Sequence, residues 1–166
     1  MTEELSRTSA LAERHRALGS GLEDWNGMGT AWTYDSNPND EHDAVREAVG
    51  MFDMSPLKKV FLRGSDAAAV LDHTITRDVS RIAVGQSAYT SVLTEEGGVA
   101  DDAIVSSIGN GEWMVAHGSG DMMALLGASA TGKDVFIEFT DDLHDISVQG
   151  PGALGVSGRS DRARDA

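Results

Sequence analysis

The spacing of apolar and polar residues along the chain predicts an ordered series of strands and helices. Residues 58–63 place Val60 and Leu62 two positions apart, as in a half-buried strand, and residues 65–75 repeat apolar residues at helical spacing. Further strands are expected at 87–94, 99–108, 112–117, 134–140 and 145–150, and a further helix at 119–132. From residue 58 the predicted order is therefore strand, helix, three strands, helix, strand, with one short strand at the end.

The first fifty residues predict two helices joined by an aromatic loop. Leu11, His15 and Leu18 lie one helical turn apart, and a glycine follows them. The second helix is expected to begin at Asp40, which can cap it, and to stop at Gly50. The segment between the helices is rich in Gly, Asn and Asp, so we expect a loop that its Trp and Tyr residues anchor.

This order of elements predicts an α+β fold, in which an antiparallel sheet carries helices on one face in a split β-α-β-like layout. We expect three segments: a helix and aromatic loop at 1–39, the α+β domain at 40–154, and a polar tail at 155–166 that we interpret as disordered or as a sign of truncation. The expected core consists of Val60, Leu62, Val70, Leu71, Ile104, Val115, Leu125 and Ile137.

Charge and composition exclude several classes of function. The 27 acidic and 13 basic residues give a net charge of −14, so binding to nucleic acid or to an anionic membrane is not expected. The absence of cysteine excludes disulfides, thiolate catalysis and iron–sulfur clusters. The first residues lack a basic start followed by an apolar run, and the chain is expected to be cytoplasmic.

Short motifs add little chemistry of their own. The pair Gly118 and Gly120 resembles the start of a dinucleotide-binding loop, but no third glycine follows, so a helix cap explains it better. The five histidines form no cluster with metal-ligand spacing, and no metal site is predicted. No serine lies in a nucleophile elbow.

Two adjacent carboxylates, Asp101 and Asp102, interrupt the apolar strand predicted at 99–108. Neighbouring side chains of a strand point to opposite faces, so one carboxylate points towards the core unless the strand begins after Asp102. In a half-dry site desolvation raises the pKa of a carboxyl group and suits it to proton handling or to binding an amino group. The residues alone leave both readings open.

Three segments together resemble the N-terminal part of the aminomethyltransferase family, whose type member is the T protein of the glycine cleavage system. The segments are "DEHDAVREAVGMFDMS", "VFLRGSDAAAVLDHTITRDVSRIAVGQSAYTSVLTEEGGVADDAIV" and "ISVQGPGAL". Shared landmarks include Phe52-Asp53-x-Ser55, Arg63-Gly64, Asp78-Val79, Gly85, Tyr89, Gly97-Gly98, Asp101-Asp102 and Gln149-Gly150-Pro151. The resemblance covers about residues 11–154.

The resemblance implies a tetrahydrofolate-dependent one-carbon transferase with a small-molecule methyl or aminomethyl donor. It implies that Asp102 is the acidic residue beside the reacting folate nitrogens, and that Tyr89, Ile104 and His117 also line the folate cavity. Held in a strand and partly buried, Asp102 is expected to act through its charge. Asp101 is expected to be solvated or to tie down the Gly97-Gly98 turn.

Two departures keep alternatives open. Pro56-Leu57 replaces the usual His-Met, and His117 replaces the usual Asn, so an O- or S-demethylase or a non-catalytic folate-binding module competes with aminomethyl transfer. The chain also has half the family's usual length. We therefore expect the isolated chain to have little activity and to need C-terminal domains or self-association to cover its apolar surface.

Overall fold

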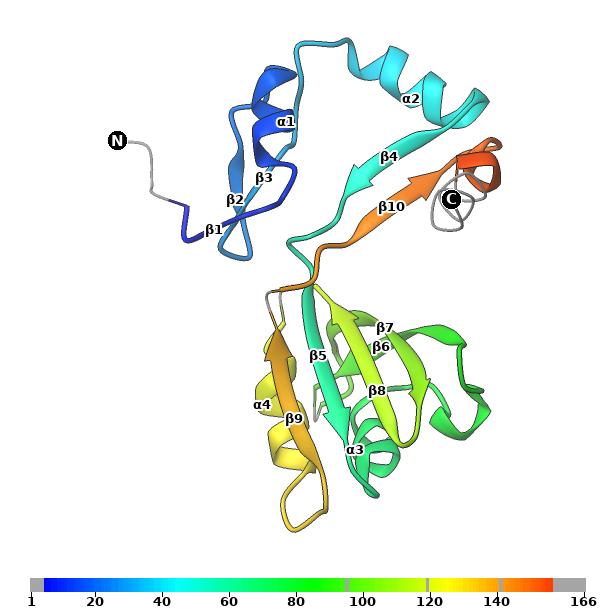
Figure 1. The fold of residues 1–166 in the computed structure, drawn as a ribbon. Helices are drawn as coiled ribbons and strands as arrows, with labels where there is room; N and C mark the ends of the chain where they lie inside the picture. Colours follow the sequence, from blue (N-terminus) through cyan, green and yellow to red (C-terminus); the bar gives the residue numbers. More distant parts are fainter. Residues whose placement is uncertain (1–4, 95, 119, 141, 157–166) are drawn as a thin grey trace, which may run out of the picture. The chain divides into compact units, whose positions relative to one another are not determined.

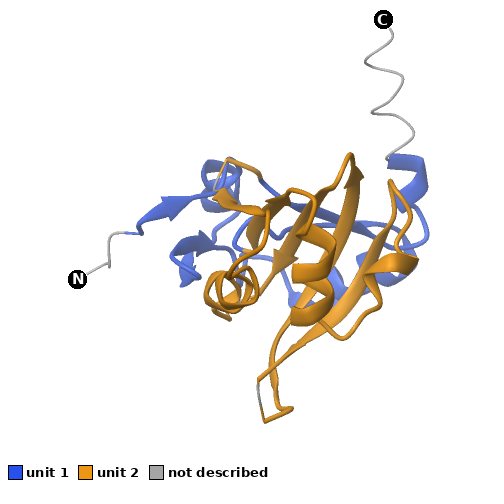
Figure 2. Cartoon of the chain, turned by 90° about the horizontal axis from the view of Figure 1, so that it is seen from below, with its two compact units in different colours: residues 1–56, 144–166 blue, residues 57–143 orange. Residues whose placement is uncertain are grey.

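The computed structural model describes residues 5–94, 96–118, 120–140 and 142–156 (Figure 1). The chain divides into two compact units, which Figure 2 distinguishes by colour. Unit 1 consists of residues 1–56 and 144–166, and unit 2 consists of residues 57–143. Among the described residues, no helix is both long and apolar enough to cross a bilayer.

Unit 2 is built on a five-stranded antiparallel sheet in the order β6-β7-β8-β5-β9. Its strands are β5 (Lys58–Arg63), β6 (Ser87–Leu93), β7 (Val99–Gly109), β8 (Glu112–His117) and β9 (Phe136–Thr140). The helices are α3 (Ala67–Thr74), the 3-10 turn η1 (Val79–Arg81) and α4 (Met122–Ser129). The predicted antiparallel sheet and α+β class are confirmed.

The core of unit 2 lies between the sheet and helices α3 and α4, which pack on the same sheet face. Strand residues Val60, Leu62 and Val115 are fully buried there against helix residues such as Leu71. Leu125 and Ile137 are only partly buried beside them. The sequence therefore predicted most of this core correctly.

Ile104 does not belong to this core, and the expectation that it does is wrong. Its side chain is 45% exposed, whereas its neighbours Ala103 and Val105 are buried. The period of β7 sets this difference, because alternate side chains of a strand face opposite sides. Ala103 and Val105 face the helices, which leaves Ile104 on the open face.

Unit 1 contains two small sheets where the sequence predicted only helices, a loop and a last strand. Its elements are β1 (Arg7–Thr8), α1 (Ala12–Ala17), β2 (Glu23–Trp25), β3 (Met28–Thr30), α2 (Pro38–Glu47), β4 (Gly50–Asp53) and β10 (Ile146–Gln149). One sheet has the order β1-β3-β2, and the other pairs β10 with β4. Positive φ angles at Asn26 and Gly27 form the tight turn between β2 and β3 in the expected loop.

The pairing of β10 with β4 joins residues that lie far apart in the chain. Because of it, α2 and β4 group with the N-terminal segment, and the units do not follow the expected ranges 1–39 and 40–154. Helix α2 begins earlier than expected, since Asn37 rather than Asp40 caps it through a hydrogen bond from Asn39 N. Of the tail expected at 155–166, residues 157–166 lie outside the described residues.

Candidate functional site

The β6–β7 hairpin brings together three of the four residues expected to bind folate. Tyr89 lies directly opposite Ile104, and Asp102 pairs with Ser91 one step further along the same open face. The Tyr89 hydroxyl donates a hydrogen bond of 2.6 Å to Asp102 Oδ2, which raises the pKa of Tyr89 above its usual value. Tyr89 is 62% exposed. The open face therefore presents a phenol, an aliphatic side chain and a carboxylate.

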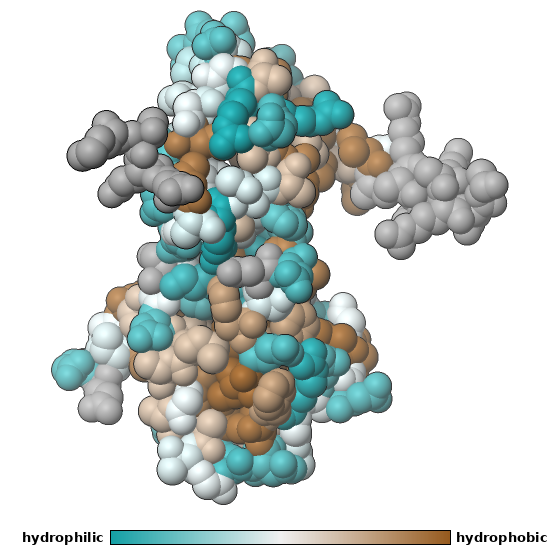
Figure 3. Space-filling view, turned by 60° about the vertical axis from the view of Figure 1, so that its left-hand side comes forward, coloured by the Kyte–Doolittle hydropathy of each residue, from teal (hydrophilic) through white to brown (hydrophobic). Residues whose placement is uncertain are grey.

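Exposed apolar residues accompany this pair on unit 2. Tyr89, Ile104, Ile108 and Val99 from the hairpin strands are among the large exposed side chains. Figure 3, which brings forward the side of unit 2 that carries α4 and β9, shows that apolar residues reach the surface there too. An aromatic and aliphatic surface that carries one carboxylate is suited to a planar heterocycle with N–H groups.

Asp101 points to the opposite face, and its environment differs from the one expected. Its side chain is only 7% exposed, so the expectation of a solvated Asp101 is wrong. It does not hold the Gly97-Gly98 turn either, because Gly98 N donates to Thr94 Oγ1 there. The parity of β7 explains the burial, since Asp101 shares a face with the buried Ala103 and Val105. Asp102, expected to be partly buried, is exposed.

The carboxylate of Asp101 accepts three hydrogen bonds. Its Oδ2 accepts from His117 Nδ1 and from Gly120 N, each at 2.9 Å, and its Oδ1 accepts from Asp102 N at 2.9 Å. Burial alone would raise the pKa of Asp101, but the hydrogen bond from His117 and those from the two backbone groups outweigh it and lower the pKa. Asp101 is therefore a buried anion whose carboxylate is held by three hydrogen bonds.

The glycines of the weak dinucleotide-like motif have a structural explanation. A Cβ atom placed on Gly118 would lie 2.8 Å from Asp101 Oδ1, and one on Gly120 would lie 2.7 Å from Asp101 Oδ2. Both distances are shorter than real Cβ contacts. The two glycines therefore let the backbone close around the Asp101 carboxylate. Ser119, between them, lies outside the described residues.

His117 lies with Asp101 rather than with Tyr89, Asp102 and Ile104. It ends β8, pairs with Ala103 across the ladder and is 2% exposed. Burial lowers its pKa, although the hydrogen bond to Asp101 opposes this shift, so the ring is neutral at pH 7. Its Nδ1 then carries the proton that Asp101 accepts. Its Nε2 is buried and has no hydrogen-bond partner among the described residues.

Acid is expected to destabilise unit 2 through this pair. Both folded pKa values are lowered, so the stability that the pair contributes is complete above the unfolded values of about 6.5 for His and about 3.9 for Asp. It is lost as pH falls through the folded values. Urea unfolding between about pH 7 and about pH 5 should show the part of this loss that comes from His117, and His117→Asn should flatten it. An equally steep profile in the variant would contradict the assignment.

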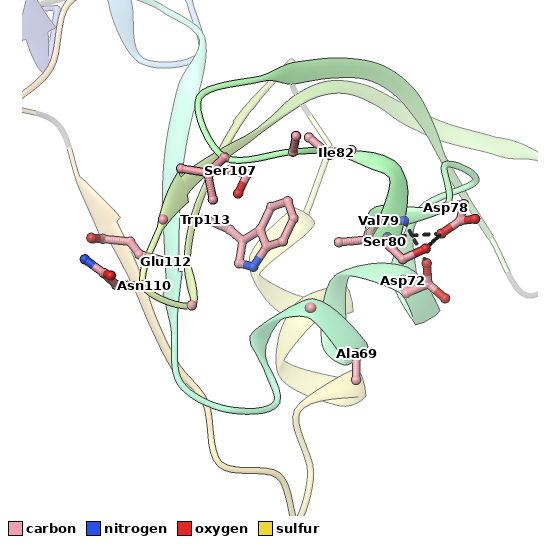
Figure 4. Close-up of a pocket in the computed structure, with 15 residues that line it drawn as sticks. Ala69, Asp72, Asp78, Val79, Ser80, Ile82, Ser107, Asn110, Glu112 and Trp113 are labelled. Atoms are coloured by element: carbon pink, nitrogen blue, oxygen red, sulfur yellow. Dashed lines mark hydrogen bonds between the residues drawn. The ribbon is translucent and has the colours of Figure 1, made fainter.

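A pocket on the helix side of unit 2 includes none of these residues. It has a volume of about 640 Å³ and opens between α3, η1 and the β7–β8 turn. Trp113 projects into it, and Asp78 at one side caps η1 by accepting from Ser80 (Figure 4). Its carboxylates are occupied by such local hydrogen bonds, so we assign it no chemistry.

Unit 1 contains a second buried polar network, which the sequence did not reveal. His15 Nε2 donates to Asp53 Oδ2 at 2.9 Å, and the Tyr34 hydroxyl lies 2.8 Å from His15 Nδ1. Asp53 also accepts from Ser9 Oγ and, at 3.1 Å, from Ser55 N. Each ring nitrogen of His15 is thus satisfied, which indicates a brace between α1, β4 and the loop rather than a reactive site.

Replacing His15 by alanine is expected to destabilise unit 1 by about 1–3 kcal/mol, because it leaves the buried carboxylate of Asp53 short of a donor. Chemical denaturation monitored by circular dichroism measures the effect. His42→Ala is the matched control, since the His42 side chain is 70% exposed. Equal effects of the two substitutions would show that the network contributes nothing.

Comparison with known proteins found a family profile and relatives that match most of this chain. A profile of the family described as "GCVT N-terminal domain" matches residues 11–161. The chain is 51% identical over 148 residues to the heme-dependent oxidative N-demethylase gamma subunit of Ectopseudomonas mendocina, covering 89% of this chain and 39% of that protein. It is 36% identical to the aminomethyltransferase of Corynebacterium jeikeium, covering 90% of this chain and 39% of that protein.

A solved structure shares the fold. The glycine cleavage system aminomethyltransferase T of Bartonella henselae superposes with a TM-score of 0.83 at 26% identity, covering 93% of this chain and 43% of that one. The chain therefore spans about two fifths of the length of the relatives that it matches.

Proposed function

Because this chain belongs to the GCVT N-terminal domain family, we propose that it is the N-terminal part of a tetrahydrofolate-dependent one-carbon transferase. Tyr89, Asp102 and Ile104 on the open face of the unit 2 sheet would contact the folate. When bound, tetrahydrofolate supplies nitrogen atoms that take up a one-carbon unit. A small-molecule methyl or aminomethyl donor would be the second reactant.

The residues of the open face suit such a ligand. Asp102 is exposed and retains acceptor capacity beyond the hydrogen bond from Tyr89, so it can accept from an N–H group or face a developing positive charge. Tyr89 and Ile104 offer a flat apolar surface beside it. Asp101 has no such freedom, because three donors already surround its carboxylate.

The observation that carries this proposal is the Tyr89–Asp102 pair on the open face. The hydroxyl of Tyr89 orients the carboxylate from one side, while the rigid hairpin fixes its backbone. A carboxylate held in this way can take a proton from, or stabilise charge on, a reactant that lies against the sheet. His117 lies on the other face, and its contact with folate stays a prediction.

A second function, receiving one-carbon units released by an N-demethylation, is favoured by one finding. Identity to the N-demethylase gamma subunit is 51%, against 36% to the aminomethyltransferase of Corynebacterium jeikeium. Pro56-Leu57 and His117 are the departures from the usual aminomethyltransferase residues. We therefore propose a donor whose methyl group is bound to nitrogen in preference to donors whose methyl group is bound to oxygen or sulfur.

Calorimetric titration of the chain with tetrahydrofolate tests the proposal. We expect saturable binding that Tyr89→Phe weakens moderately and Asp102→Asn weakens strongly, because the first removes a hydroxyl and the second a charge. Ser87→Ala, at an exposed position of β6, is the control. Absence of binding would refute the proposal for this chain, and binding without transfer in the presence of donors would fit both an N-terminal part of the transferase and the non-catalytic module.

A further inference from the structure

The β7–β8 ladder ends before it reaches the two carboxylates. The last pair is Ala103 with His117, so Asp101 and Asp102 extend beyond the end of β8. On their other side, the β6–β7 register shifts between Val92 and Leu93, next to the pair of Val92 with Asp101. The strand therefore carries its exposed acid beyond the end of β8, where only β6 pairs with it and where the β6–β7 register shifts one residue further on.

The side chain of Asp101 connects this part of β7 to β8, which the β7–β8 ladder no longer does. One carboxylate oxygen accepts from the backbone N–H of Asp102, and the other accepts from the side chain of His117 and from the Gly120 N–H, all at 2.9 Å. The Asp101 carboxylate thus ties the peptide before Asp102 to the end of β8 and to the loop that follows. We propose that the Asp101–His117 pair is a positioning device that holds the Asp102 carboxylate against Tyr89 for the function proposed above, on which this inference rests.

The role of His117 in this device depends on its proton. Nδ1–H must donate to Asp101, so Nε2 carries the lone pair, and that atom is buried without a partner among the described residues. A proton on Nε2 would add a buried charge and an unsatisfied donor. The charged groups that face the ring are Asp101 from β7, Lys58 from β5 and Asp121 before α4.

Asparagine at position 117 is the informative substitution. Its amide can donate to the Asp101 carboxylate but does not titrate in the physiological range, whereas leucine of similar bulk cannot donate at all. Asp101→Asn is the reciprocal change, since a neutral amide cannot accept from all three donors in the same way. None of these variants alters Tyr89 or Asp102 themselves.

The first measurement is the pKa of the Tyr89 phenol in the free chain, followed by NMR. In the wild type the hydrogen bond to Asp102 holds this pKa above the ordinary value. We expect His117→Leu and Asp101→Asn to return it towards that of a free tyrosine, and His117→Asn to keep it raised. A raised pKa in a folded His117→Leu or Asp101→Asn variant would overturn the inference.

The second measurement is the dissociation constant of tetrahydrofolate for the same proteins. We expect His117→Leu to weaken binding by roughly tenfold, the loss of about one oriented hydrogen bond, and His117→Asn to recover it to within about threefold. If the wild type binds no folate, the proposed function fails, while the Tyr89 titration still decides the positioning role. Normal binding by a folded His117→Leu variant would also overturn the inference.

A third measurement uses the wild type alone and does not depend on variants that fold. Nitrogen-15 spectra of the histidine rings at neutral pH should show a protonated Nδ1 and a bare Nε2 for His117. The opposite tautomer would break the hydrogen bond to Asp101 and overturn the inference. Circular dichroism of every variant separates loss of position from loss of fold.

Discussion

Asp102→Asn is expected to reduce one-carbon transfer by about a hundredfold or more while leaving the fold intact. Asparagine keeps the shape of the side chain and can still accept from Tyr89, so the change removes mainly the negative charge. The negative charge allows a positioned carboxylate to accept a proton or to stabilise a developing positive charge. The exposed position of Asp102 implies little effect on stability.

The assay should use a chimaera that joins this chain to the C-terminal part of the N-demethylase gamma subunit, to which it is 51% identical. Asp24→Asn, an exposed carboxylate of unit 1, is the matched control and should keep full turnover. Full activity of Asp102→Asn together with complete loss in Asp101→Asn would move the acid role to the buried carboxylate.

Leu71→Ala is expected to lower the free energy of unfolding by about 2–5 kcal/mol. Leu71 of α3 is fully buried in the cluster that joins both helices to the sheet, so truncation leaves a cavity there. Equilibrium unfolding in urea measures the loss. Ile104→Ala is the matched control: it shortens an aliphatic side chain that is 45% exposed and should change stability by less than about 1 kcal/mol.

A large loss of stability in Ile104→Ala would mean that the open face of the sheet is buried in the protein in solution. The control therefore tests a feature of the structure as well as the scale of the cavity effect. It also separates the two faces of β7 experimentally, because Ala103 and Val105 on the other face belong to the core.

The sequence predicted the framework of unit 2 well because its elements have strong periods and glycine-rich turns. Strand β8 alternates cleanly, and Val60, Leu62 and Val115 are fully buried as expected. The face of β7 was harder to assign. Its sequence places apolar residues on both sides, with Ile104 and Val105 adjacent, so period alone does not tell which one is inside.

The surroundings of the carboxylates depend on contacts between distant residues. Once Ala103 is paired with His117, strand parity places Asp101 on the histidine side, but this pairing depends on the length of the β7–β8 turn. Nothing local marks Gly118 and Gly120 as the wall around Asp101, and nothing local joins His15 to Asp53, which lies 38 residues away. Such pairs follow from tertiary structure rather than from motifs.

The tight turn between β7 and β8 limits the insertions and deletions that this part of the chain can tolerate. Gly109, Asn110 and Gly111 all have positive φ, and this turn sets the register that pairs Ala103 with His117. Inserting a single codon here, if the ladder absorbed it, would turn His117 away from Asp101, because a slip of one residue exchanges the faces of a strand. Insertions of two codons preserve parity, so natural length variation at this turn should favour even steps.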